Sequence, residues 1–292
     1  MINHEIIDKK WGEPDPTHDP YALAHFKPRA TDVLITTAAK AGTTWMQQIL
    51  HQLRTGGDDQ FQAIDDVVPW LELPRSGIHW SEVLAGYEAL ADPRLFKTHC
   101  TYEQTPGTDT AIKNRPRIIL TSRDPRDCCI SFYHHKMDMT DEAKAQMGMT
   151  DPESFDHFLD DWLRFESWYR NVSSWWPHRN DENVLWLRFE DLKQDLNAGI
   201  TQILDFLDWQ ISDAQRIRVL ELCSFQWMKE NAQRFTQQGL SDKPIFKPGG
   251  FIRKGQVGGG KAALTEAQEA RILDKARQKL TPDCLDFFDI DR

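Results

Sequence analysis

The sequence lacks any apolar run long enough to cross a membrane, and it has no excess of positive charge. No segment approaches the roughly 18 consecutive apolar residues that a membrane helix needs. Lys and Arg number 35 against 45 Asp and Glu, which gives a net charge of −10 at pH 7. This balance disfavours binding to nucleic acid or to an anionic membrane surface. A site for an anionic ligand must therefore gather a few cations locally.

Cysteine pairs and a signal peptide are also missing. The five cysteines are odd in number and show no CxxC spacing, so we expect reduced thiols rather than a disulfide framework. The opening stretch MINHEIIDKKWGEPDP has no long apolar core of the kind that marks a signal peptide. We therefore expect a cytoplasmic protein that is not an integral membrane protein. The 292 residues suit one large domain or two small ones, and no internal repeat divides them.

Apolar runs alternate with helical patterns along the chain. Strands are predicted at 32–37, 95–97, 117–122 and 183–189, and helices at 43–55, 153–176 and around 196–207. This alternation predicts an α/β fold with a central parallel sheet, in which ligands lie beyond the carboxyl ends of the strands. The Gly/Pro/Lys-rich stretch 236–262 is predicted to be a long ordered loop or a lid.

The stretch VLITTAAKAGTTW, residues 33–45, has the construction of a phosphate-binding loop. Its small residues let backbone N–H groups approach an anion, and Thr43 and Thr44 open the following helix. In the common P-loop the lysine follows the last glycine, whereas here Lys40 precedes Gly42. A kinase or NTPase using Mg-ATP remains an alternative, although only Glu190-Asp191 resembles its metal-binding acid. An ordinary strand-to-helix turn is the other alternative.

Two further stretches follow predicted strands. In LFKTH, Lys97 and His99 lie two residues apart and so point to the same side of an extended segment. The lysine disfavours the cationic imidazole, and a neutral imidazole can accept a proton from a hydroxyl. In RIILTSRDPRDCCISFYHH, Arg123 can bind phosphate oxygens and Ser131 faces roughly the same side. The alternatives are a surface Lys-His pair and a capped helix in which Asp124 and Asp127 pair with Arg126.

The stretch PGGFIRKGQVGGGK, residues 248–261, brings together Arg253, Lys254 and the free backbone of Gly255. The glycines at 258–260 predict a flexible loop, and a solvated linker is the alternative. Trp45 and Phe225 can enclose a purine ring if both lie near the anion site, or both belong to the core. His134-His135 predicts no metal site, because no second ligand pair stands at metal spacing.

Together these stretches resemble the cytosolic-type sulfotransferases, and the glycolipid sulfotransferases of bacteria among them. The family motifs match TTAAKAGTTW at 36–45, KTH at 97–99, RDPRDCCISFYH at 123–134, SFQWMKEN at 224–231 and RKGQVGGGK at 253–261. They stand in the family's order from about residue 30 to 265. The resemblance implies a single domain over 1–292 with a P-loop-like three-layer fold, and 3′-phosphoadenosine 5′-phosphosulfate (PAPS) as co-substrate.

The resemblance also implies a role for each matching residue. The implied PAPS-binding residues are Lys40, Ala41, Gly42, Thr43, Thr44, Trp45, Arg123, Ser131, Phe225, Arg253, Lys254 and Gly255. The implied catalytic residues are His99, Lys40, Lys97 and Ser131, with His99 as the base that deprotonates an acceptor hydroxyl. No metal is expected. The acceptor pocket would be built from Phe26, Trp70, Trp80, Tyr133 and His135, which suits a small apolar molecule or a glycolipid.

The chain departs from the family pattern at several positions. Ala38-Ala39 replace Tyr-Pro, Ala41 replaces a serine, and Gly259-Gly260 replace Asp-Trp. The dimer motif of the family is degenerate at 261–270, where the chain reads KAALTEAQEA, so a dimer rests on weak grounds. A non-catalytic nucleotide-binding module, which would keep the phosphate contacts and lack a base, is a third possibility beside the sulfotransferase and the kinase.

Overall fold

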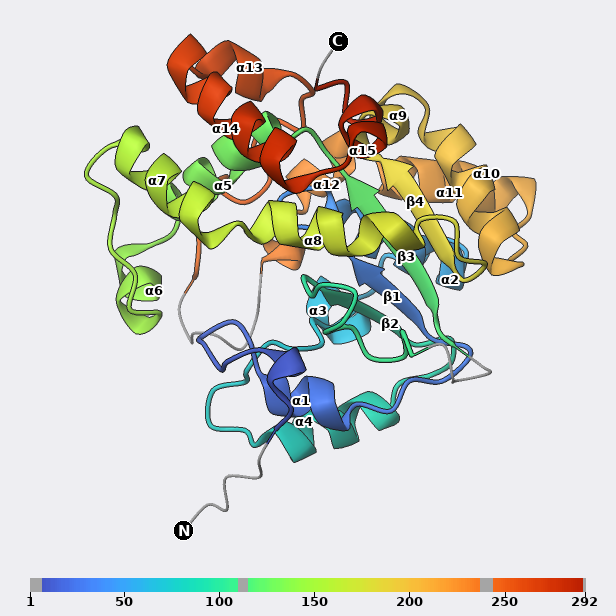
Figure 1. The fold of residues 1–292 in the computed structure, drawn as a ribbon. Helices are drawn as coiled ribbons and strands as arrows, with labels where there is room; N and C mark the ends of the chain where they lie inside the picture. Colours follow the sequence, from blue (N-terminus) through green and yellow to red (C-terminus); the bar gives the residue numbers. More distant parts are fainter. Residues whose placement is uncertain (1–6, 110–114, 237–243, 291–292) are drawn as a thin grey trace.

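A four-stranded parallel sheet forms the centre of the computed structural model, which describes residues 7–109, 115–236 and 244–290 (Figure 1). The strands are β1 (Val33–Thr36), β2 (Leu95–Thr98), β3 (Arg117–Ser122) and β4 (Val184–Arg188), in the order β2-β1-β3-β4. Val33 pairs with Leu95 on one side and with Arg117 on the other. The predicted α/β fold with a central parallel sheet is confirmed.

Helices flank the sheet. The α-helices are α1 (Pro20–His25), α2 (Thr43–Thr55), α3 (Ile64–Val67), α4 (Trp80–Glu88), α5 (Pro125–Met137), α6 (Asp141–Gln146), α7 (Phe155–Phe165), α8 (Ser167–Trp175), α9 (Phe189–Gln194), α10 (Leu196–Leu207), α11 (Asp213–Leu222), α12 (Phe225–Glu230), α13 (Gly259–Ala263), α14 (Glu266–Lys279) and α15 (Pro282–Phe287). Short 3-10 helices lie at Lys9–Trp11, Trp176–His178 and Ala232–Phe235.

The side chains of β1 alternate between two apolar cores, which makes the molecule three-layered. Val33 and Ile35 pack with residues of α2, α10 and α11 on one face of the sheet. Leu34 packs on the opposite face, with Leu23 of α1 and Trp175 of α8. Because successive strand side chains point to opposite faces, a fully buried strand needs helices on both sides.

Local sequence signals account for the elements next to the cavity described below. Helix α2 spans the predicted residues 43–55, and Gly56 ends it with a φ of 71°. Helix α5 begins at Pro125, and the Asp124 side chain accepts a hydrogen bond from the Arg126 N–H. Pro suits the first helical position, where an N–H has no helical partner. Both elements are therefore predictable from their capping residues.

Residues 153–176 do not form the single helix that the sequence predicts. Two helices, α7 and α8, meet at Glu166, whose φ is 54°. The Glu166 carboxylate forms ion pairs with Lys275 and Lys279 of α14. The chain breaks there because a contact with a distant helix holds the residue in the left-handed region, and no local proline or glycine marks the break.

The predicted flexible glycine loop is also wrong over part of its length. Gly259 and Gly260 open α13, which packs against α5. A Cβ on Gly260 would lie 2.4 Å from the backbone carbon of Arg126, so only glycine allows this approach. Residues 244–258 form an ordered loop, as predicted for part of 236–262, while 237–243 lie outside the described residues.

All five cysteines are free, as predicted, and all five are buried. Among the helices of the described residues, none has both the length and the apolar character that a membrane crossing requires.

Candidate active site

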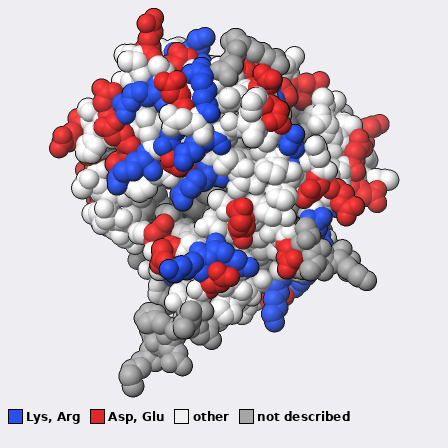
Figure 2. All heavy atoms as spheres, in the orientation of Figure 1, with Lys and Arg blue, Asp and Glu red and all other residues white. Residues whose placement is uncertain are grey.

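A cavity of about 1050 Å³ opens beyond the carboxyl ends of β1, β2 and β3. Figure 2 shows this face hollowed between groups of Lys and Arg side chains. The predicted residues that line the cavity are Lys40, Gly42, Thr43, Thr44, Trp45, Lys97, His99, Arg123, Ser131, Phe225, Arg253, Lys254 and Gly255. Segments more than 200 residues apart in sequence therefore converge on one site, as the topology of a parallel sheet requires.

Ala41 is the one predicted PAPS-binding residue that does not line the cavity. Its methyl group is fully buried in the core formed with Cys128 and Trp168. Its backbone N–H donates to the Ala38 carbonyl and so is not free for an anion. The small residue at this position serves packing and the turn, and it does not line the cavity.

The loop before α2 is shaped to receive an anion. Lys40 has a φ of 68° and Gly42 a φ of 102°, two left-handed residues that turn the chain over the end of β1. No side chain caps α2, so its first N–H groups have no protein partner. The Thr43 hydroxyl is buried and also lacks a partner. Unpartnered donors at a helix N-terminus favour a bound anion.

Arg123 joins three segments at the cavity. Its guanidinium donates to the Gln256 carbonyl at 2.7 Å, to Asp127 Oδ2 at 3.2 Å and to the Lys40 carbonyl at 3.4 Å. Its Nε is buried without a hydrogen-bond partner, so the guanidinium keeps unused donor capacity. This one side chain thus ties the phosphate loop to the ordered loop before α13.

The Asp127 carboxylate binds the backbone at the start of α13, shortly after Arg253. The carboxylate accepts hydrogen bonds from Gly258 N at 2.9 Å and from Gly260 N at 2.5 Å. The alternative in which Asp127 pairs with Arg126 is wrong, because Arg126 pairs with Asp124 and Glu269. Asp127 is instead part of the scaffold of the site, where it binds Arg123 and the start of α13.

Trp45 and Phe225 both lie near the Lys193 ammonium, which is 5.7 Å from each ring centroid. The Trp45 indole N–H donates to the Cys223 carbonyl at 2.8 Å, which fixes the ring plane. A Cβ on Gly255 would lie 2.6 Å from the Phe225 ring. The two aromatic side chains thus line the cavity close to the same cation.

His99 has one tautomer imposed by the fold. Its Nδ1 lies 2.7 Å from the Thr37 carbonyl, which only accepts, so Nδ1 carries the proton. The lone pair then resides on Nε2. Burial, with smaller effects of Lys97 and Lys40, lowers the pKa of His99 to about 4, so the ring is neutral near pH 7. The Trp70 ring meets the imidazole edge-on, with centroids 5.0 Å apart.

The cavity is lined by two lysines with different partners. Lys97 is buried, and its Nζ lies 3.9 Å from Asp65 Oδ1 and 4.6 Å from the Trp70 ring centroid. Lys40 Nζ lies 3.0 Å from His135 Nδ1 and has no carboxylate partner among the described residues. Burial of the amine, then repulsion from Lys97, Arg123 and Arg253, lowers the pKa of Lys40 to about 7. When it is protonated, Lys40 is thus a cation without a counter-charge.

The predicted acceptor residues separate into two groups. Trp70 and His135 line the cavity. Phe26 packs instead against Phe96 in the core, Trp80 stacks on His25, and Tyr133 packs on Phe155 and Phe158. Other apolar side chains that line the cavity are Met139, Met147, Met149, Phe158, Trp162, Phe165, Phe246 and Phe251. They come from the residues that flank α6, from α7 and from the loop before α13, which short motifs do not reveal.

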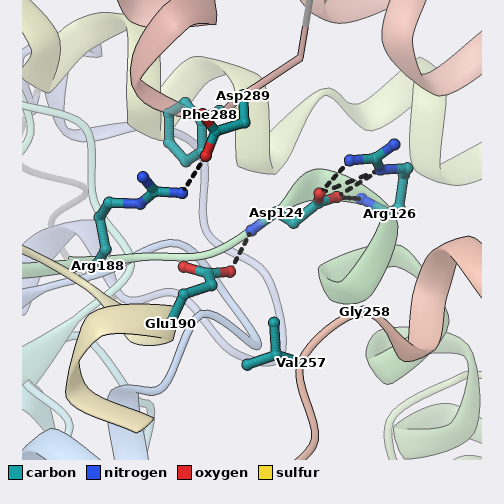
Figure 3. Close-up of a pocket in the computed structure, with 8 residues that line it drawn as sticks. All are labelled: Asp124, Arg126, Arg188, Glu190, Val257, Gly258, Phe288 and Asp289. Carbon is teal, nitrogen blue, oxygen red and sulfur yellow. Dashed lines mark hydrogen bonds and ion pairs between the residues drawn. The ribbon is translucent and has the colours of Figure 1, made fainter. Parts of the chain in front are cut away.

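A second, smaller cavity of about 190 Å³ is lined by Val257, Gly258 and six further residues (Figure 3). Its two arginines are already paired, because Arg188 contacts Asp289 at 2.8 Å and Arg126 contacts Asp124. Its surplus of carboxylates makes it a poor anion site. The cations that remain open to a ligand belong to the large cavity.

Comparison with known proteins gives one consistent result. A protein-family profile described as "Sulfotransferase domain" matches residues 30–282. The chain is 31% identical over 259 residues to the amine sulfotransferase of Oryctolagus cuniculus, covering 86% of this chain and 81% of that protein. It is 30% identical over 272 residues to sulfotransferase 1 family member D1 of Mus musculus, covering 90% and 88% respectively.

Solved structures share the fold. A mouse sulfotransferase complexed with PAP superposes with a TM-score of 0.71 at 23% identity, covering 92% of both chains. A retinol dehydratase in complex with androsterone and the inactive cofactor PAP gives a TM-score of 0.65 at 20% identity, covering 90% of this chain and 85% of that chain.

Proposed function

This chain belongs to the sulfotransferase family, and from that premise we propose that it transfers a sulfuryl group from PAPS to a hydroxyl of an apolar or lipid-like acceptor. The observation that carries the proposal is the convergence of unpartnered anion donors, an aromatic pair and a neutral histidine in one cavity. We call the part lined by Lys40–Trp45, Arg123, Ser131, Phe225 and Arg253–Gly255 the nucleotide end. The part lined by Trp70, His99, Met139 and Phe246 is the acceptor end.

The nucleotide end offers donors for two separate anionic groups. The N-terminus of α2, the Thr43 hydroxyl and Lys40 would hold the 5′-phosphosulfate. Arg123, Ser131, Arg253, Lys254 and the Gly255 backbone would hold the 3′-phosphate, and Arg123 Nε is a buried donor that awaits a partner. This second group of cations favours PAPS over ATP, because ATP has no 3′-phosphate.

Trp45 and Phe225 would enclose the adenine ring. Offset aromatic stacking contributes roughly 0.5–1.5 kcal/mol beyond the area buried. The Lys193 ammonium lies 5.7 Å from each ring centroid and would move aside or reach the edge of the purine. The hydrogen bond from Trp45 to the Cys223 carbonyl keeps its ring in place in either case.

His99 would act as the general base. With its Nδ1 proton held by the Thr37 carbonyl, Nε2 accepts the proton of the acceptor hydroxyl as the oxygen attacks. PAPS, when bound, supplies the sulfuryl group that the oxygen receives in line with the departing adenosine 3′,5′-bisphosphate. The role of His99 is thus to hold one proton while the new bond to oxygen forms.

Lys40 and Lys97 would place positive charge at the junction of the two ends. Lys40 contacts the neutral His135 and the Phe251 ring, neither of which is an anion, so its charge when protonated is available to the bound anion. Lys97 is held between Asp65 and Trp70 and so has less freedom to move. Fixed charges in a buried site are more effective than in water, because they need no reorganisation during reaction. The reaction as we propose it needs no metal ion.

The acceptor end suggests the acceptor class. Its Met and aromatic side chains give an apolar wall on which a ring or an alkyl chain can pack. A phenol, a long-chain alcohol and a glycolipid all fit this description.

A transfer assay tests the proposal. The purified protein would be supplied with PAPS carrying labelled sulfate and with a phenol, a long-chain alcohol, a glycolipid or an aryl amine, in the presence of a chelator. We expect labelled product with at least one hydroxyl acceptor. A parallel reaction with Mg-ATP tests the kinase alternative, and phosphate transfer without any sulfate transfer would overturn the proposal.

A further inference from the structure

Three potential metal ligands meet at the edge of the large cavity, where the proposed transfer reaction assigns them no role. His18 precedes α1, Glu72 follows the segment that pairs with β2, and Cys100 follows β2. One ligand atom from each lies within 4.8 Å of the other two. Glu72 and Cys100 are each 2% exposed, and all three residues line the cavity.

Each of the three groups is anchored on one side and open on the other. His18 Nε2 lies 2.6 Å from the Trp11 carbonyl, which only accepts, so the proton is on Nε2 and the Nδ1 lone pair is free. Glu72 Oε1 accepts the His99 backbone N–H at 2.9 Å, whereas Oε2 is buried without a partner.

The Cys100 backbone is anchored in the same way. Its N–H donates to Thr98 Oγ1 at 3.1 Å, and its carbonyl accepts hydrogen bonds from Asn171 and Trp175. Its thiol forms no disulfide, and it interacts with the side chains of Glu72 and Thr98. The thiol and the carboxylate therefore already face each other within the cluster.

The size of the triangle suits a small cation. With sides of at most 4.8 Å, its centre lies at most about 2.8 Å from each ligand atom. Zinc bonds to nitrogen, oxygen and sulfur measure roughly 2.0–2.3 Å, so each group must move inward by up to about 0.8 Å. A thiolate and an imidazole favour zinc over magnesium or calcium, which prefer oxygen ligands.

We propose that His18, Glu72 and Cys100 bind one zinc ion, with the cavity supplying a water molecule as the fourth ligand. Binding releases the thiol proton of Cys100 to solvent, and the Glu72 carboxylate and neutral His18 complete the protein ligands. The bonds of His18 to the Trp11 carbonyl and of Glu72 to the His99 N–H are the outer contacts that orient metal ligands. The ion lies beside the acceptor end and takes no part in holding PAPS.

Cobalt binding tests the proposal, because thiolate-bound Co²⁺ absorbs in the near ultraviolet and tetrahedral Co²⁺ absorbs strongly in the visible range. The full chain, freed of metal with a chelator, is titrated with Co²⁺ and then with Zn²⁺. We expect one equivalent of Co²⁺, both sets of bands, and loss of the bands as Zn²⁺ displaces the cobalt. Metal analysis after dialysis against Zn²⁺ gives the stoichiometry independently.

Matched variants assign the bands to the site. Cys100→Ser should abolish the near-ultraviolet band, and His18→Ala should weaken Co²⁺ binding by at least about tenfold. Cys284→Ser removes another buried free thiol, which does not line the cavity, and should leave the titration unchanged. Circular dichroism and binding of adenosine 3′,5′-bisphosphate check that each variant is folded. If Cys100→Ser does not fold, His18→Ala alone decides.

Absence of a thiolate band in the wild-type protein would overturn the proposal, as would a band that survives Cys100→Ser or binding unaffected by His18→Ala. The transfer assay is read separately. Zinc binding without sulfate transfer would support this metal site and contradict the proposed function. Sulfate transfer without zinc binding would support the proposed function and contradict this metal site.

Discussion

The nucleotide end and the acceptor end of the cavity are built in different ways. The nucleotide end consists of backbone donors, a helix N-terminus and cations that short motifs place at the ends of strands. The acceptor end consists mainly of apolar side chains from the residues that flank α6, from α7 and from the loop before α13. The nucleotide end depends on backbone conformation, whereas the acceptor end depends on how side chains from distant segments pack together. The two ends should therefore respond differently to substitution.

The largest separation between the two ends is expected from His99→Ala. Loss of a general base typically reduces turnover by roughly 10²–10⁴-fold, while the nucleotide contacts remain. We expect turnover to fall by that amount and the dissociation constant of adenosine 3′,5′-bisphosphate to change by less than about threefold. Steady-state kinetics and calorimetry measure the two effects, with the exposed His79→Ala as control. Turnover at the wild-type level would show that another group takes the proton.

Gly260→Ala should damage the nucleotide end specifically. The added methyl would meet the Arg126 backbone and displace α13 from Asp127, which also orients Arg123. We expect the affinity for adenosine 3′,5′-bisphosphate to fall roughly tenfold or more. Gly259→Ala is the matched control, because its Cβ would meet nothing within 4 Å. Equal affinities of the two variants would contradict the role given to this contact.

Lys40 should take up a proton when the nucleotide end is filled. Its pKa is lowered to about 7 by burial and by Lys97, Arg123 and Arg253, with the neutral His135 as its contact. A bound phosphate raises that pKa again, because it favours the charged form. Near pH 7.5 we therefore expect binding of adenosine 3′,5′-bisphosphate to withdraw a fraction of a proton from the buffer.

Calorimetry in buffers of different ionisation enthalpy measures that proton. Lys40→Met should abolish most of the uptake, and Lys136→Met serves as a control on the neighbouring helix α5. Proton release on binding, or uptake unchanged in Lys40→Met, would contradict the assignment.

The smallest effect is expected from Phe246→Leu at the acceptor end. Phe246 faces His135 with ring centroids 4.7 Å apart, and leucine keeps the site apolar while it removes an aromatic wall. We expect the KM for the acceptor to rise by roughly 3- to 30-fold, with nucleotide affinity unchanged. If nucleotide affinity fell while the acceptor KM rose, the two ends would not respond independently to substitution, and the distinction between them would be wrong.

The difference between the ends also explains what the sequence can predict. The loop from Lys40 to Trp45, the strand end at His99 and the cap at Asp124 follow from residue type and spacing over a few positions. Each is a local property, because a helix start or a strand end is set by its immediate neighbours.

The remaining features depend on contacts between distant segments. Ala41 resembles a loop residue but packs in the core, and Glu166 breaks a helix because Lys275 and Lys279 hold it. Phe26, Trp80 and Tyr133 were expected at the acceptor end and pack elsewhere, because an aromatic side chain gives no signal of which cluster it will join. Asp127 could have been found, since an acid next to a strand-end arginine can orient it.

Calorimetric titration with adenosine 3′,5′-bisphosphate, beside Mg-ATP, tests the central claim most directly. The account predicts binding of the bisphosphate that does not require metal and that weakens roughly 10- to 100-fold in Arg253→Ala. Arg216→Ala, which removes a surface arginine bonded to Asn197 and Thr201, should leave it unchanged. Preference for Mg-ATP with no binding of the bisphosphate would contradict the account and would indicate that the phosphate loop serves a kinase or NTPase.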